Sequence, residues 1–119
     1  MSAVRKSETC EEQLKRMVRN VADEITSGKT ERLSDYDSKC EVILEAGRFM
    51  EGVYDIRYLV DREKRFLGAE LLVAGGGPTV WVDTFREQVT GWWGTDRVEW
   101  YYQENIGLND YLENLYACS

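Results

Sequence analysis

Apolar and polar residues alternate in the middle of the chain, between residues 53 and 102. From Tyr54 to Val60 every second residue is apolar, which is the period of a strand with one buried face. Four more runs rich in strand formers follow, at Phe66–Ala74, Thr79–Thr84, Val89–Gly94 and Arg97–Tyr102. Together with Val53–Asp61, these runs predict a five-stranded antiparallel meander.

The turns between the strands set which residues face each other. If each turn closes symmetrically, Asp61 faces Phe66, Ala74 faces Thr79, Thr84 faces Val89 and Gly94 faces Arg97. Directly opposed residues share a face, so one face is apolar throughout. That face carries Tyr54, Ile56, Tyr58, Val60, Leu67, Ala69, Leu71, Val73, Val80, Val82, Gly91, Trp93, Val98, Trp100 and Tyr102. A slip of one residue at any turn would break this agreement.

The opposite face mixes polar residues with large aromatic ones. Its polar members are Asp55, Arg57, Glu70, Asp83, Thr90, Arg97 and Glu99, and its apolar members are Leu72, Trp81, Trp92 and Tyr101. One row across the sheet is expected to read Asp55, Leu72, Trp81, Trp92, Glu99, with the two tryptophans side by side. Aromatic residues ringed by carboxylates are typical of a binding surface. The alternative is that the first or last helix covers this face as a second core.

Helical patterns flank the predicted sheet. Thr9–Ser27 begins with a capping-box pair, Thr9 and Glu12, and ends before Gly28. Ser34–Ala46 is predicted as a second helix, after a connector at Lys29–Leu33, and Leu108–Ala117 as a third. These elements predict one two-layer α+β domain over residues 1–119, with two N-terminal helices and one C-terminal helix.

Composition narrows the classes of function. The 119 residues carry a net charge of −7, which disfavours direct binding to nucleic acid and favours a basic partner. No apolar run approaches the ~20 residues of a membrane span, and Met1–Lys6 lacks the apolar core of a signal peptide. We therefore expect a cytoplasmic protein without membrane contact.

The residues for common catalytic and metal sites are sparse. The chain has no histidine, which removes histidine-based catalysis and the commonest metal ligand. No Walker lysine follows Gly75-Gly76-Gly77, so these glycines are interpreted as a hairpin turn rather than a phosphate loop. The odd number and wide spacing of Cys10, Cys40 and Cys118 indicate reduced thiols, which we expect to be buried. We expect no cofactor and no metal.

Part of the meander resembles a known family. A Gly-Gly-Pro turn ending at Pro78, a strand ending Val82-Asp83-Thr84 and a double aromatic at Trp92-Trp93 follow one another in order. This pattern is similar to that of a family of small proteins from mobile elements and prophages of gut Firmicutes and related bacteria, over about residues 50–119. The resemblance carries over no catalytic residue. It implies a neighbourhood of accessory genes, where inhibitors of host defence are common.

Three functions compete for this sequence. The first is a non-catalytic inhibitor of a host nucleic-acid-binding defence enzyme, of the anti-CRISPR or anti-restriction kind, steered by charge into a basic channel. The second is an interaction or assembly module, such as a homodimer that buries Trp81 and Trp92. The third is an enzyme using paired carboxylates, which we do not expect because such carboxylates more often form cross-strand ion pairs. The predicted protein-binding residues are Asp55, Glu70, Leu72, Trp81, Asp83, Trp92, Glu99 and Tyr101.

Overall fold

The computed structural model describes residues 9–33, 39–43 and 45–118, with backbone only for those between 30 and 43. The elements in chain order are α1 (Cys10–Ser27), β1 (Lys29–Leu33), β2 (Lys39–Ile43), α2 (Ala46–Met50), β3 (Asp55–Val60), β4 (Phe66–Ala74), β5 (Thr79–Asp83), β6 (Gln88–Trp93), β7 (Asp96–Tyr101) and α3 (Leu108–Ala117). None of the helices in these described ranges is long and apolar enough to cross a membrane.

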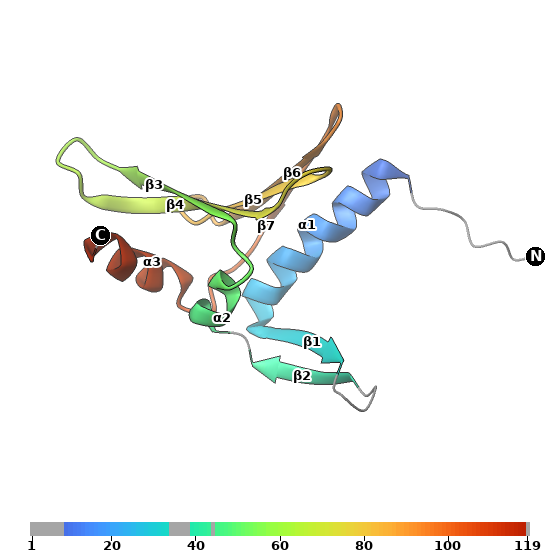
Figure 1. Cartoon of the computed structure of the whole chain (residues 1–119), viewed down its shortest axis with the longest axis horizontal. Coiled ribbons are helices and arrows are strands. Elements are labelled where there is room, and N and C mark those ends of the chain that lie inside the picture. Colours follow the sequence, from blue (N-terminus) through green and yellow to red (C-terminus); the bar gives the residue numbers. More distant parts are fainter. Residues whose placement is uncertain (1–8, 34–38, 44, 119) are drawn as a thin grey trace, which may run out of the picture.

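The predicted five-stranded antiparallel meander is confirmed, and so is the α+β fold. Strands β3 to β7 lie side by side in chain order. Helix α1 packs on β6 and β7, and α3 packs on β4. Figure 1 shows both helices on the same side of the sheet. We call the helix-covered side the inner face and the opposite side the outer face.

The predicted strand register is correct over most of β3–β4 and β4–β5, and it is shifted in β5–β6 and β6–β7. At irregularities near the strand ends, Phe66 pairs with Val60 rather than Asp61, and Ala74 pairs with Val80 rather than Thr79. Asp55 faces Leu72 and Leu72 faces Trp81, as expected. Trp81 faces Thr90 rather than Trp92, and Trp92 faces Arg97 rather than Glu99. Both shifts are two residues long, so the side chains of β6 and β7 keep their predicted faces.

The turns explain these two shifts. Thr84 leaves the β5–β6 ladder because its backbone and side chain both bond Ala69: the Thr84 N–H donates to the Ala69 carbonyl at 2.9 Å, and the Ala69 N–H donates to Thr84 Oγ1 at 2.9 Å. The β6–β7 turn begins at Gly94, whose φ of 63° is the left-handed conformation that glycine tolerates best. Each turn therefore starts one residue earlier than symmetric closure predicts.

Local sequence signals place α1 and α3 correctly. The capping box of α1 is present: Thr9 Oγ1 accepts from the Glu12 N–H, and the Glu12 carboxylate accepts from the Thr9 N–H, both at 3.1 Å. Gly28 ends the helix at φ 70°, with its N–H donating to the Glu24 carbonyl. Helix α3 spans the predicted Leu108–Ala117.

The predicted helix at Ser34–Ala46 is wrong. Lys39–Ile43 is strand β2, and it pairs with β1 in the segment that was predicted as a connector. The sequence favours a strand here because Val42 and Ile43 are β-branched, and pairing satisfies the backbone groups of both segments. The second helix, α2, begins only at Ala46. The expected cap residues Ser34 and Asp37 lie outside the described residues.

The core lies between the inner face and the two longer helices. Its fully buried members are Leu14, Val18, Ile25, Leu71, Val80, Val82, Val89, Leu108 and Leu112. Gly91 lets α1 approach β6 closely, because a Cβ atom there would lie 2.7 Å from Val18 Cγ2 and 2.8 Å from Leu14 Cδ1. A glycine at this strand position is thus a packing requirement of the two-layer fold.

Three residues predicted on the buried face are exposed. Tyr54 is 76% exposed because it precedes β3, where no helix covers it. Leu67 lies at the β3–β4 irregularity opposite Leu59 and Val60, and this bulge turns it outward. Trp100 is 43% exposed because β7 is the sheet edge, with no described strand beyond it.

Candidate protein-binding face

The outer face carries every residue predicted to bind a protein. One observed row reads Asp55, Leu72, Trp81, Thr90, Glu99, and the next reads Arg57, Glu70, Asp83, Gln88, Tyr101. Trp92 lies in a third row, with Thr79 and Arg97. The expectation that Trp81 and Trp92 lie side by side is therefore wrong. They are diagonal neighbours on adjacent strands, because Trp81 faces Thr90, two positions before Trp92.

No helix of the described residues covers the outer face, because α1 and α3 both pack on the inner side. Trp92 is 39% exposed and Tyr101 is 72% exposed, while Trp81 and Leu72 are half-buried. The alternative of a second core beneath α1 or α3 is thereby removed. The aromatic residues of this face meet solvent directly.

An arginine stacks on each tryptophan of the outer face. The Arg57 guanidinium lies 4.7 Å from the centre of the Trp81 ring, and the Arg97 guanidinium lies 5.7 Å from that of Trp92. Each such contact contributes about 0.5–1 kcal/mol at an exposed site. The stacks restrict the rotamers of both rings, so less side-chain entropy is lost when a partner binds them.

Each stacking arginine also contacts a carboxylate on its own strand. Arg57 Nε lies 4.0 Å from Asp55 Oδ2, and Arg97 Nη2 lies 2.6 Å from Glu99 Oε2. All four side chains are largely exposed, so these ion pairs add little to stability. They place a carboxylate beside each stacking guanidinium. Sequence reasoning missed both stacks, although an arginine two positions from a carboxylate on each edge strand was visible.

Two carboxylates face each other near the middle of the sheet. Glu70 on β4 is directly opposite Asp83 on β5, and like charges in this position destabilise a sheet. Asp83 has a structural role, because its Oδ1 accepts the N–H groups of Phe85 and Arg86 at 3.0 Å and holds the following turn. Both carboxylates line a shallow groove of about 260 Å³ together with Arg57, Leu59, Phe85 and Arg86.

The turn beside this groove is fastened to α3 from the inner side. The Thr84 hydroxyl donates to Asn109 Oδ1 at 3.3 Å, and the Asn109 N–H donates to a Glu104 carboxylate oxygen at 2.9 Å. Gly68 makes room for the turn, since a Cβ atom there would lie 2.7 Å from Phe85 Cβ. These contacts hold the end of the groove in place.

Among the described residues, the pKa of Tyr102 departs furthest from its ordinary value. Burial raises its pKa, and the nearby carboxylates of Glu104, Glu87 and Asp83 raise that pKa further. The hydroxyl is buried and has no hydrogen-bond partner among the described residues. It therefore remains a neutral phenol in the folded protein at ordinary pH.

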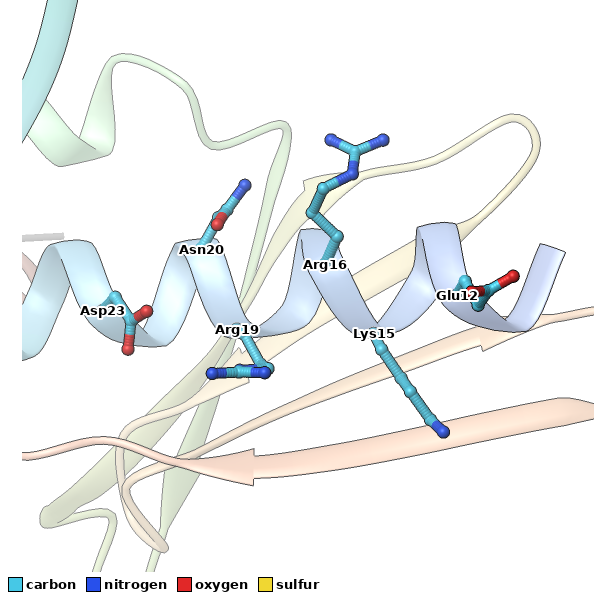
Figure 2. A pocket seen from close by; sticks show the side chains of 6 residues that line it. All are labelled: Glu12, Lys15, Arg16, Arg19, Asn20 and Asp23. Carbon is cyan, nitrogen blue, oxygen red and sulfur yellow. The ribbon is translucent and has the colours of Figure 1, made fainter. Parts of the chain in front are cut away.

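The polar side of α1 forms a second hollow, of about 380 Å³, lined by Glu12, Lys15, Arg16, Arg19, Asn20 and Asp23. Figure 2 shows that these side chains spread in several directions rather than converging: Arg16 points away from Lys15 and Arg19. Arg19 stacks on Trp100 at 4.8 Å on the inner side of β7. The mixed charges and divergent side chains provide no common point for a ligand.

The thiols differ from expectation in their burial. Cys10 and Cys118 are free but exposed, so the prediction that they are buried is wrong. Cys10 is the first residue of α1, and Cys118 is the residue that caps the end of α3. The Cys40 side chain lies outside the described side chains. Among the described residues, no group of three or more acidic or cysteine side chains is arranged to hold a metal ion.

Comparisons with protein-family models, curated proteins and solved structures found no match to this chain. The resemblance to mobile-element proteins therefore remains a prediction.

Proposed function

We propose that this chain is a non-catalytic binding domain that docks a protein partner on its outer face. The observation that carries the proposal is the pair of arginine-stacked tryptophans, the half-buried Trp81 and the exposed Trp92, on a sheet face that no described helix covers. Tryptophan is enriched among the residues that dominate interface energies. Rings that are already held in place bind at a lower entropic cost.

The charge of the face favours a basic partner. The four carboxylates Asp55, Glu70, Asp83 and Glu99 outnumber Arg57 and Arg97, which already contact Asp55 and Glu99. The whole chain has a net charge of −7, which speeds encounter with a positively charged surface. The class that fits best is a basic protein that itself binds nucleic acid, such as a host defence enzyme, which this chain would inhibit by occupying the nucleic-acid channel.

The proposal is tested by quantitative capture from host lysate with three forms of the chain. Wild type, Trp92→Ala and Tyr111→Ala are immobilised at equal density, and the captured protein is then purified and titrated. Tyr111 is the matched control because it is also 39% exposed but lies on α3, off the outer face. We expect Trp92→Ala to weaken binding by about 2 kcal/mol or more, roughly 30-fold, and Tyr111→Ala to change it little.

The captured partner also shows whether this chain is an inhibitor of a nucleic-acid-binding protein. A nucleic acid that fills the partner's channel should compete with this chain, and Glu70→Gln should reduce the salt dependence of association. A partner that is acidic, or that binds nucleic acid and this chain together, would refute the inhibitor role. Equal loss of affinity in Trp92→Ala and Tyr111→Ala would refute the outer face as the interface.

A further inference from the structure

Strand β7 is an edge of the sheet, and its outward backbone groups can be assigned. The Tyr102 N–H donates to the Glu87 carbonyl at 3.1 Å, in line with the β6–β7 pairing. Residues of an antiparallel strand alternate in the direction of their backbone groups. Val98 and Trp100 therefore bond β6, whereas Arg97, Glu99 and Tyr101 direct their N–H and C=O groups away from the sheet. No strand of the described residues pairs with that side.

This edge lacks a proline, a bulge and a pairing strand among the described residues, and the charged side chains that it does carry, Asp96, Arg97 and Glu99, are of both signs. Exposed edges are commonly protected by proline, by a bulge or by a covering segment. β7 contains no proline, and its pairing with β6 is regular from Asp96 to Tyr101. The other edge, β3, has an irregularity between Leu59 and Val60. β7 is thus the edge better suited to accept another strand.

We propose that β7 pairs antiparallel with β7 of a second copy of this chain, so that two five-stranded sheets join into one. Three symmetric registers bring the outward charged residues Arg97 and Glu99 opposite their own kind or each other. Arg97 opposite Arg97 of the second copy, or Glu99 opposite Glu99 of the second copy, brings like charges together, which is destabilising. The register between them places Arg97 opposite Glu99 of the second copy, twice, about a two-fold axis at Val98. The strand is self-complementary in this register.

The inner side of the same register is also complementary. It places Asp96 of the second copy opposite Trp100. The Arg19 guanidinium lies 4.8 Å over the Trp100 ring, so this carboxylate would approach a cation already held at the edge. The partly exposed surface of Trp100, 43% in the single chain, would be covered by the second copy. The inference does not depend on the proposed function, because it rests on the β7 edge and on the pairing of Arg97 with Glu99, and not on the binding of a partner by Trp81 and Trp92.

The test is a charge exchange across the axis. Arg97→Glu and Glu99→Arg each create like-charge pairs with their own copies, so each variant alone should dimerise at least about tenfold more weakly than wild type. An equimolar mixture of the two variants restores both opposite-charge pairs and should form a mixed dimer. Asp55→Arg is the matched control, because Asp55 also contacts a strand neighbour, Arg57, but lies on the β3 edge. It should dimerise like wild type.

Sedimentation equilibrium gives the dissociation constants, and native mass spectrometry distinguishes mixed from single-variant dimers. A folded wild type that stays monomeric at millimolar concentration would overturn the inference. So would single variants that dimerise like wild type, or a mixture that forms no mixed dimer. Because partner capture is measured separately, failure of this dimer leaves the proposed function standing, and the reverse also holds.

Discussion

Replacing Gly91 by alanine tests the packing of α1 on the sheet. The added Cβ would lie 2.7 Å from Val18 Cγ2 and 2.8 Å from Leu14 Cδ1, and both side chains are fully buried. Carbon atoms at ordinary contact are about 3.5–4.0 Å apart, so α1 or its side chains must shift by several tenths of an ångström.

The expected cost is the difference of two effects. Overpacking a well-packed core costs about 1–3 kcal/mol. Exchange of glycine for alanine also reduces the conformational entropy of the unfolded chain, which stabilises the folded state by about 0.4–1 kcal/mol. The net loss in unfolding free energy for Gly91→Ala is therefore about 1–2 kcal/mol, or a fall of about 4–8 °C in Tm.

Urea unfolding followed by circular dichroism measures this loss. Gly77→Ala is the matched control, because no described heavy atom lies within 4 Å of a Cβ there, and it should be neutral or slightly stabilising. Leu14→Ala makes room for the new methyl group, so the double variant with Gly91→Ala should lose at least about 0.5 kcal/mol less than the sum of the single variants. Equal stability of Gly91→Ala and Gly77→Ala, or strict additivity with Leu14→Ala, would refute the close approach of α1 and β6.

Three further predictions follow from the described side chains. The raised pKa of Tyr102 makes the folded state lose stability as the pH rises above about 10. Tyr102→Phe should therefore abolish that alkaline loss and raise the unfolding free energy at neutral pH by up to about 1 kcal/mol. A loss of stability at neutral pH would show that the hydroxyl has a partner. The Arg65 backbone N–H, donating to Asp61, lowers the pKa of that carboxyl, so stability should fall as the pH drops below about 4, and Asp61→Asn should make urea midpoints less dependent on pH there. Cys10 and Cys118 are exposed, so a maleimide should label both in the folded protein nearly as fast as in urea, and strong protection of either thiol would contradict their placement.

The sequence predicts those parts of the fold that depend on local signals, such as helix caps, or on the alternation of side chains along a strand. The capping box at Thr9 and the left-handed Gly28 locate α1 because both act within a few residues. Apart from Leu67 at the β3–β4 bulge, the two faces of the meander are largely correct, because a shift of two residues leaves side-chain direction unchanged. Whether the outer face is covered was not visible in the sequence, since it depends on which side α1 and α3 pack.

The errors come from interactions that the pattern does not encode. The exact row of Trp92 depends on Thr84, which leaves its ladder to bond Ala69 on β4. The helix predicted at β2 is wrong because this segment is stabilised by pairing with β1, which its own periodicity does not reveal. The arginine stacks on Trp81 and Trp92 depend on how long side chains reach across neighbouring strands. Each of these is a tertiary interaction, which the local propensity of a segment does not reveal.

Hydroxyl-radical footprinting of the free chain and of its complex tests the central claim, that the outer face is an accessible binding surface. In the free chain, Trp92 and Tyr101 should be oxidised readily, in keeping with their exposed fractions of 39% and 72%. In the complex, both should be protected, while Tyr111 on α3 should react as it does in the free chain. Protection of Tyr111 with unchanged oxidation of Trp92 and Tyr101 would place the interface elsewhere and contradict the account.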